Sequence, residues 1–481
     1  MIQILNRTLG FQTNSSSSHA LVILNRKEKK KIKDQDENNY YGGNDFVCLS
    51  LESKKRYFKA MLARYFNIYI GDYKSDDDYD DNDYDDIELQ CASDTLDLKI
   101  KEEFGEEIYK ELLGTATVLN NFGSDISLDF PKGFNGKIHK EFAILIMKYF
   151  FREDVAVMGG YDNDDMSFEQ YTHFPLKYLF SCNSVIRQDD YGFWIIFDKE
   201  YGERTIFKLG REKLIDNLFA PKTSTPCLVD FKITNFCNRG CRYCYQSSNE
   251  NGEHAASKNI YSILRALAVL EVFEIAIGGG EPTLHPAFLN ILHSAHELGI
   301  TPNFTTRNID YLVKNNDEIS KYIGQVAISC DTPTEVEHVI SLRNHIPNFS
   351  IQLVMGMINR YDFKKIVDIC NEAYVPLSLL GYKSIGRGFN CKPINYDWWL
   401  DDLASAAHVF IDTALASQYK QKILEDTKYK KLYIGFQEGV VSCYIDAVSN
   451  FMAKSSYSDS GLSFDKNKNL AQFFKSSFAD F

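Results

Sequence analysis

The sequence has little that would direct it to a membrane or to nucleic acid. No segment approaches the roughly 20 consecutive apolar residues of a membrane-spanning helix, and the first eleven residues lack the apolar core of a secretory signal. Positive charge is not in excess, since the formal net charge is −13. A uniformly basic nucleic-acid-binding surface is therefore not indicated. The 11 cysteines are odd in number, and we expect a soluble, cytoplasmic protein with reduced thiols.

Most of the net charge comes from one segment. Residues 72–88 hold nine Asp and one Glu against one Lys, a contribution of −9 that leaves −4 for the rest of the chain. Like charges repel and the segment has no apolar periodicity, so we predict an acidic loop. It lacks the Gly and Glu positions of an EF-hand, so calcium binding is not expected.

The length of 481 residues predicts two or three domains of about 100–200 residues each. Residues 1–181 are expected to form a mixed α/β accessory domain, with helices near 56–69, 100–113 and 137–151. Residues 182–222 contain short strand-like segments separated by turn sequences, followed by a helical segment at 211–218, which predicts a β-hairpin module.

Two short runs in the accessory domain are each open to two interpretations. The serine run 15–18 is either a polar turn or a hydroxyl-rich surface that binds an anion or is itself modified. The basic run 26–33 is either a solvated face or a contact for a phosphate backbone.

From residue 226 onward, strand-like and helical segments alternate. This alternation implies a parallel sheet with right-handed crossovers, and six such units curve into a partial (βα)6 barrel rather than the closed eight-fold form. The barrel is expected over residues 223–390, with functional loops at the carboxyl ends of its strands. The six strands are predicted at Leu228–Ile233, Phe273–Ile277, Thr301–Thr305, Gln325–Ser329, Ser350–Val354 and Leu377–Leu380.

A short C-terminal helical and β extension is expected over residues 391–481. Residues 397–416 are predicted to be one helix and residues 440–452 to be strand-like, and we expect the last thirty residues to be poorly packed in part.

Three cysteines, Cys237, Cys241 and Cys244, follow the first expected strand of the barrel. Their spacing allows one loop to turn three sulfurs toward one inorganic centre. A structural zinc site closes with four protein ligands, so three thiolates suggest a centre with one open position. Iron–sulfur clusters are the other choice for a set of thiolates.

The pattern CxxxCxxC, with Tyr243 before the third cysteine, resembles the cluster loop of the radical S-adenosylmethionine (radical SAM) enzymes. The sequence Gly279-Gly280-Glu281-Pro282, at the end of the second strand, resembles the GGEP segment of the same family. The resemblance implies a [4Fe–4S] cluster on the three cysteines and S-adenosylmethionine on the free iron. Reductive cleavage would then give a 5′-deoxyadenosyl radical that abstracts a hydrogen atom from the substrate.

The resemblance also implies cofactor-binding positions. Tyr243 would lie by the adenine, and the segment ending at Glu281 would address the amino end of S-adenosylmethionine. Residues after the third and fourth strands would contact the ribose or carboxylate. Arg387 is either part of the segment closing the sixth strand or a surface turn. The implied cofactor-binding residues are Tyr243, Gly279, Gly280, Glu281, Thr305, Thr306, Asn308, Ser329 and Asp331.

Three functions stay open at this stage. The first is hydrogen abstraction from a peptide or protein, because the β-hairpin module faintly resembles the leader-recognition modules of peptide-modifying members, although it could equally be a lid. Cys443 likewise resembles the start of their C-terminal extension, here without an auxiliary cluster. The second is the same chemistry on a nucleotide, nucleobase or other small molecule. The third is a non-enzymatic scaffold with zinc, completed by His254 or His285. An enzyme of this family would also need an electron donor such as flavodoxin or ferredoxin.

Overall fold

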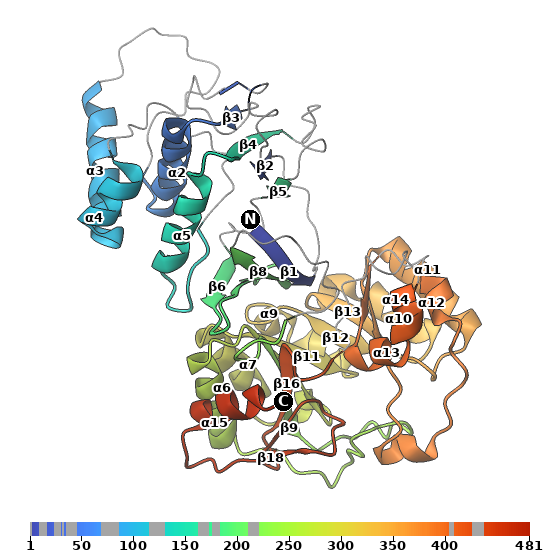
Figure 1. The fold of residues 1–481 in the computed structure, drawn as a ribbon. Helices are drawn as coiled ribbons and strands as arrows, with labels where there is room; N and C mark the ends of the chain where they lie inside the picture. Colours follow the sequence, from blue (N-terminus) through green and yellow to red (C-terminus); the bar gives the residue numbers. More distant parts are fainter. Residues whose placement is uncertain are drawn as a thin grey trace. The chain divides into compact units, whose positions relative to one another are not determined.

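The computed structural model describes twelve stretches of the chain, which divide into two compact units, drawn in Figure 1. The first unit contains most of residues 10–213, and the second contains residues 214–481 with two short earlier segments. Part of the serine run, most of the acidic loop and the helix expected at 211–218 lie outside the described residues. Those described are 2–8, 17–23, 30, 33–34, 46–68, 86–114, 130–161, 173–175, 183–209, 221–403, 408–425 and 437–481.

The first unit combines helices with a four-stranded sheet of order β3-β4-β2-β5. Its aromatic core includes Phe58, whose ring lies 5.2 Å from that of Phe130 and 5.4 Å from that of Phe150. The helices expected near 56–69 and 137–151 are confirmed, with shifted ends. The range 100–113 is helical but is broken at Gly105 and ends in a π-helical turn. The elements are β2 (Ser17–Ile23), β3 (Phe46–Cys48), α2 (Leu51–Tyr65), α3 (Asp86–Phe104), α4 (Glu106–Ile108), η1 (Tyr109–Leu113), α5 (Lys140–Phe150), β4 (Val155–Tyr161) and β5 (His173–Pro175). A first strand, β1 (Ile2–Thr8), precedes them and is assigned mostly to the second unit.

The β-hairpin expected within residues 182–222 is present as β6 (Ser184–Gln188), β7 (Trp194–Asp198) and β8 (Glu203–Leu209). Strands β7 and β8 pair in antiparallel fashion. Gly202 closes their turn at φ +66°, a conformation that glycine adopts without steric cost.

The second unit is built on a ten-stranded, mostly parallel sheet of order β15-β14-β13-β12-β11-β10-β9-β16-β17-β18. Its six strands β9 to β14 confirm the six that the sequence predicts, and they form an open sheet. The strands are β9 (Leu228–Thr234), β10 (Glu274–Gly279), β11 (Thr301–Thr306), β12 (Val326–Ser329), β13 (Phe349–Val354), β14 (Leu377–Leu380), β15 (Val409–Ile411), β16 (Ser442–Asp446), β17 (Phe451–Ala453) and β18 (Gly461–Ser463).

The C-terminal extension contributes strands to both edges of this sheet. Strand β16 runs parallel to β9, and β15 runs parallel to β14. The single helix predicted at 397–416 is therefore wrong. Its place is taken by α12 (Trp399–Asp402), β15 and α13 (Thr413–Gln418), followed by α14 (Lys420–Glu425).

Helices cover one face of the sheet, and polar residues occupy the other. In β9, the alternate residues Val229, Phe231 and Ile233 are buried in the hydrophobic core, whereas Asp230 and Lys232 point to the opposite face. The helices between the strands are α6 (Ser257–Val269), α7 (Phe288–Glu297), α8 (Ile309–Lys314), α9 (Asn316–Ile319), α10 (Pro333–Ser341) and α11 (Arg360–Ala373).

The last helix, α15 (Leu470–Ala479), packs beside α6 (Figure 1). It buries Leu470, Phe474 and Phe478 in the core of the second unit. The expectation that the last thirty residues are poorly packed is therefore wrong for this helix, because its apolar residues recur at i, i+4 and i+8.

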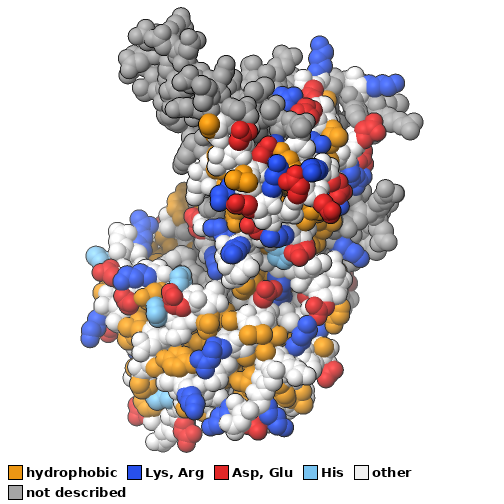
Figure 2. All heavy atoms as spheres, turned by 90° about the vertical axis from the view of Figure 1, so that its left-hand side faces the viewer, with side chains coloured by type: hydrophobic (Ala, Val, Ile, Leu, Met, Phe, Trp, Pro, Cys, Tyr) orange, Lys and Arg blue, Asp and Glu red, His pale blue; other side chains and the backbone are white. Residues whose placement is uncertain are grey.

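Acidic and basic side chains are interspersed on the face drawn in Figure 2. Ion pairs of the first unit include Lys99 with Glu102 in α3, at 3.2 Å, and Lys110 of η1 with Glu106, at 3.1 Å. No helix among the described residues has the length and apolar character that a membrane crossing requires.

Candidate active site

The three cysteines lie on a loop that leaves β9 and closes on itself. The backbone N–H of Asn235 donates to the carbonyl of Glu253 at 2.8 Å, and that of Cys237 donates to Asn249 at 3.0 Å. Gly240, between the first two cysteines, has φ +66°. All three cysteines are half-buried free thiols. The loop therefore holds its three sulfurs partly accessible at the carboxyl edge of the parallel sheet.

Close backbone contact joins this loop to the Gly-Gly-Glu segment. The N–H of Gly280 donates to Thr234 O and that of Glu281 donates to Phe236 O, each at 2.8 Å. A Cβ on Gly280 would lie 2.0 Å from Phe236 O, and one on Gly279 would lie 2.2 Å from Thr234 O. The absence of side chains at Gly279 and Gly280 therefore lets the cysteine loop lie directly against the end of β10.

Glu281 is buried, with 3% of its surface exposed. Its carboxylate accepts hydrogen bonds from the hydroxyl of Thr306 at 2.6 Å, from the hydroxyl of Thr283 at 2.8 Å and from the N–H of Arg307 at 3.2 Å. Glu281 therefore ties the end of β10 to the end of β11, and its predicted contact with S-adenosylmethionine would be made from within this network.

Tyr243 is held by two residues from neighbouring strands. Its hydroxyl donates to Asp331, after β12, and accepts a hydrogen bond from Arg307, after β11. Arg307 also pairs with Asp331 at 2.7 Å. Burial and the hydrogen bond to Asp331 raise the pKa of Tyr243 well above its usual value, although the Arg307 charge opposes the rise. The phenol therefore stays protonated, and its ring position is fixed.

The remaining predicted residues lie at the same edge of the sheet. The Thr305 hydroxyl donates to the Gln352 side chain at 3.3 Å, and the Asn308 amide donates to the Thr283 hydroxyl at 2.9 Å. Ser329 ends β12 and pairs in register with Gln352 of β13. The fold thus gathers the predicted positions at the ends of β9 to β12.

Arg387 is part of this site, so the surface-turn interpretation is wrong. Its side chain donates to the carbonyl of Cys241 at 2.9 Å and to that of Ser248 at 2.8 Å, and its backbone N–H donates to Cys244 O at 3.0 Å. Its Nη2 atom is buried and has no hydrogen-bond partner among the described residues. Arg387 therefore fastens the cysteine loop to the segment after β14.

The three thiols of this loop are the residue type that holds an iron–sulfur cluster. Three half-buried thiols share one loop, and the unpartnered nitrogen of Arg387 adds a positive group next to it. Zinc completed by His285 fits less well, because its Nε2 contacts Ala255 O at 3.0 Å and its Nδ1 accepts from Ala287 N at 3.1 Å. Within the described residues, no set of three or more His, Cys, Asp or Glu is grouped to hold one metal ion.

Sequence reasoning missed a group of charged residues near the cysteine loop. Lys383 follows β14, and its ammonium lies 4.6 Å from the ring centre of Tyr245, the residue after Cys244. Asp230 lies in the middle of β9 on the polar face of the sheet. The charged residues Asp230 and Lys232, which alternate with apolar residues in Leu228–Ile233, were the available signal.

Comparison with known proteins identifies the class of this site. Residues 231–381 match the family model described as the Radical SAM superfamily, so this part of the chain is a radical SAM domain. Enzymes of this family use a [4Fe–4S] cluster and S-adenosylmethionine, and the cysteine loop and the Gly-Gly-Glu segment both lie within the match.

Individual curated relatives match a limited part of this chain. The mycofactocin maturase MftC of Mycobacterium ulcerans is 32% identical over 118 residues, which cover 23% of this chain and 30% of that protein. A GTP 3′,8-cyclase of Actinobacillus pleuropneumoniae is 35% identical over 69 residues, 14% of this chain and 20% of that protein. The chain thus spans less than a third of either curated relative.

Among solved structures, Streptococcus suis SuiB bound to the precursor peptide SuiA is 15% identical. The match has a TM-score of 0.46 and covers 61% of this chain and 87% of SuiB.

Proposed function

We propose that this protein is a radical SAM enzyme that cleaves S-adenosylmethionine reductively and abstracts a hydrogen atom from a peptide or protein. The observation that carries the proposal is the docking of the three-cysteine loop on the Gly-Gly-Glu segment, inside the region of the family match. When bound, the cluster supplies the electron that breaks the carbon–sulfur bond of S-adenosylmethionine.

In this proposal the chain binds and orients its cofactors. The thiolates of Cys237, Cys241 and Cys244 are the cluster ligands. Arg387 holds their loop through two carbonyl oxygens. Tyr243, fixed by its neighbours, offers a ring for the adenine. These positions are set before the cofactors bind, which lowers the cost of ordering them.

Two further groups of residues limit movement around the proposed cofactor site. Glu281 joins the ends of β10 and β11, which carry the proposed contacts to S-adenosylmethionine. The ion pair of Arg307 with Asp331 joins the ends of β11 and β12. Well-held groups exclude water and competing reactions from a reactive intermediate.

A peptide or protein substrate is supported by the match to a maturase and by the β-hairpin module that precedes the radical SAM domain. The second candidate is a nucleotide, and the match to a GTP cyclase favours it. We further propose a reducing compartment such as the cytoplasm, because the ten described cysteines are free thiols. A flavodoxin or ferredoxin is the proposed electron donor.

The test is the yield of 5′-deoxyadenosine from anaerobically reconstituted protein with strong reductant. We expect a low yield without substrate and a higher yield with a peptide, above all one encoded beside this gene. Stimulation by GTP or another nucleotide, and not by peptides, would replace the first candidate with the second.

A further inference from the structure

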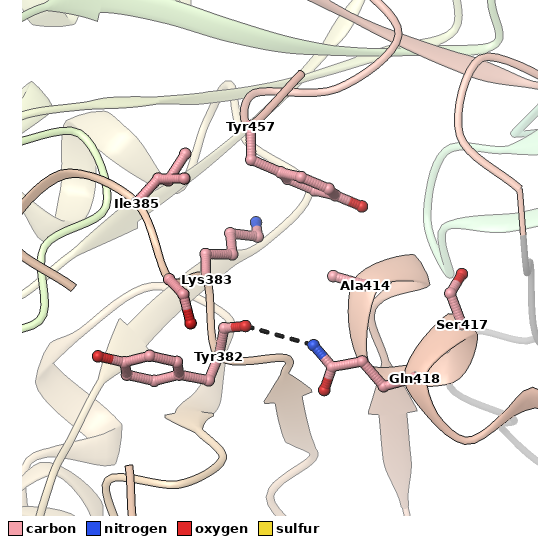
Figure 3. Close-up of a pocket in the computed structure, with 8 residues that line it drawn as sticks. Tyr382, Lys383, Ile385, Ala414, Ser417, Gln418 and Tyr457 are labelled. Atoms are coloured by element: carbon pink, nitrogen blue, oxygen red, sulfur yellow. Dashed lines mark hydrogen bonds between the residues drawn. The ribbon is translucent and has the colours of Figure 1, made fainter. Parts of the chain in front are cut away.

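A pocket of about 400 Å³ opens at the carboxyl end of β14 (Figure 3). Its walls are the segment after β14, helix α13 and the ring of Tyr457 from the C-terminal extension. Figure 3 shows the Lys383 side chain extending between these walls, with its ammonium toward Tyr457. The amide of Gln418 donates to the Tyr382 carbonyl at 3.3 Å and closes the opposite side.

Lys383 links the lining of the pocket to Tyr245, the residue after Cys244. The Lys383 ammonium lies 4.6 Å from the ring centre of Tyr245 and 4.8 Å from that of Tyr457. A Cβ on Gly386, three residues after Lys383, would lie 2.2 Å from Tyr245 O. A molecule in the pocket would therefore lie next to the loop that carries the three cysteines.

The Lys383 ammonium contacts two aromatic rings but donates no hydrogen bond to any residue in the described part of the chain. Burial alone would lower its pKa, but Tyr245 and three carboxylates raise the pKa above its ordinary value. Lys383 is half-buried, and an ammonium that stays charged there is stabilised by acceptors for its protons. It therefore points to a ligand that accepts hydrogen bonds.

The three carboxylates around Lys383 are already engaged or lie on another strand. Asp412 accepts from the N–H groups of Gly381 and Leu415, at 2.9 and 2.7 Å. Glu438 accepts from the hydroxyl of Tyr457 at 2.6 Å, and Asp230 belongs to β9. None of them forms a direct ion pair with Lys383 among the described residues. They hold it charged and leave its N–H groups to the pocket.

The charges around Lys383 decide which kind of hydrogen-bond acceptor the pocket favours in a ligand. Three carboxylates surround one ammonium, and burial raises the pKa of each of them, to about 6 for Asp230 and about 7 for Glu438. Above pH 7, where Asp230 and Glu438 are both mostly ionised, the surroundings of Lys383 carry an excess of negative charge. A phosphate or a carboxylate entering the pocket would meet that excess at short range and low dielectric. An uncharged carbonyl avoids this repulsion and still gains a hydrogen bond from a charged donor.

We propose that this pocket is a substrate subsite in which the Lys383 ammonium donates to an uncharged amide carbonyl of a peptide. The inference rests on the proposed function and deepens it. It names Lys383 as a residue that binds the peptide, and it predicts that nucleoside triphosphates bind this pocket less well than peptides.

The test measures binding to the reconstituted holoprotein by ligand-observed NMR. The probes are a pool of uncharged hexapeptides, acetylated and amidated at their ends, and GTP. Three variants are compared: Lys383→Met, Ser417→Trp at the exposed rim of the pocket, and the exposed Lys392→Met as a matched control. Ser417→Trp narrows the pocket without burying or removing a charge, so it tests the site even if Lys383→Met folds poorly.

We expect the wild type and Lys392→Met to bind the capped peptides with the same affinity. Lys383→Met should weaken binding about tenfold, as the loss of one hydrogen bond to a charged group predicts, and Ser417→Trp should weaken it at least as much. GTP should bind weakly and independently of Lys383.

Unchanged peptide affinity in both pocket variants would overturn the subsite, as would GTP binding that depends on Lys383. A wild type that forms 5′-deoxyadenosine but binds no capped peptide would also overturn it, and would leave the radical SAM activity standing. A wild type that forms no 5′-deoxyadenosine would instead refute the proposed function itself.

Discussion

At the scale of single residues, Gly280 and Gly278 are two positions apart in the sequence but differ in the space available for a side chain. A Cβ on Gly280 would lie 2.0 Å from Phe236 O, whereas a Cβ on Gly278 would have no atom within 4 Å. Gly280→Ala must push the cysteine loop away from β10. We expect it to lower the free energy of unfolding by at least about 2 kcal/mol and to reduce iron incorporation. Gly278→Ala should unfold like the wild type in a urea titration, and equal loss in both would contradict the docking.

Arg387 supplies two side-chain hydrogen bonds to the cysteine loop. Arg387→Gln cannot replace both, so we expect faster amide hydrogen exchange over residues 237–248 and a loss of about 2–4 kcal/mol in local stability. Exposed Arg343 provides the control, because Arg343→Gln removes the same charge far from the loop in the sequence. Exchange rates that are unchanged in Arg387→Gln would show that the loop is held without it.

Glu438 makes stability depend on pH. Burial raises its pKa from 4.5 to about 7, although the hydrogen bond from Tyr457 opposes the rise. Between these two values the folded chain keeps a proton that the unfolded chain has released. The free energy of unfolding therefore falls as the pH rises from about 4.5 to 7, by up to about 3 kcal/mol for this group.

Glu438→Gln keeps an oxygen acceptor for Tyr457 and removes the titration. We expect the variant to match the wild type near pH 4.5 and to be more stable at pH 8, in chemical unfolding at both values. A variant that is less stable at pH 8 would show that the ionised carboxylate contributes more through Lys383 than its burial costs.

At the scale of elements, the C-terminal extension completes the sheet. Strand β16 pairs along β9, and α15 buries Phe474 fully in the core beside α6. We expect Phe474→Ala to lower the free energy of unfolding by about 3–5 kcal/mol. Phe389, which is 77% exposed, is the matched control. If both variants unfold alike in a denaturant titration, α15 does not belong to the cooperative core.

The elements of the barrel could be predicted because their signals are local. Strands β9 to β14 are short apolar runs between helical segments, and each begins or ends within one residue of its expected position. The extension could not be predicted in the same way. Val409–Ile411 is too short to be distinguished from a helix by periodicity, and only its pairing with β14 makes it a strand.

At the scale of the whole molecule, the sequence motifs located the candidate site. They did not reveal the long-range contacts that join the cysteine loop to later segments of the chain. The cysteines and the Gly-Gly-Glu segment are visible in sequence because their spacing is fixed by local chemistry. Arg387 contacts Cys241, which lies 146 residues earlier in the chain. Lys383 contacts Tyr245, which lies about 140 residues earlier. No local pattern records such a contact. The expected domain limits at residues 181, 222 and 390 stay predictions.

The account depends on a cluster that S-adenosylmethionine can reach. The most direct measurement is the formation of 5′-deoxyadenosine by anaerobically reconstituted protein under strong reductant, in the wild type, Cys241→Ala and Cys443→Ala. Cys443 is buried in β16, away from the cysteine loop in the sequence. We predict product and about four iron atoms per chain in the wild type and in Cys443→Ala, and neither in Cys241→Ala. Zinc in place of iron, or intact S-adenosylmethionine in the wild type, would contradict the account.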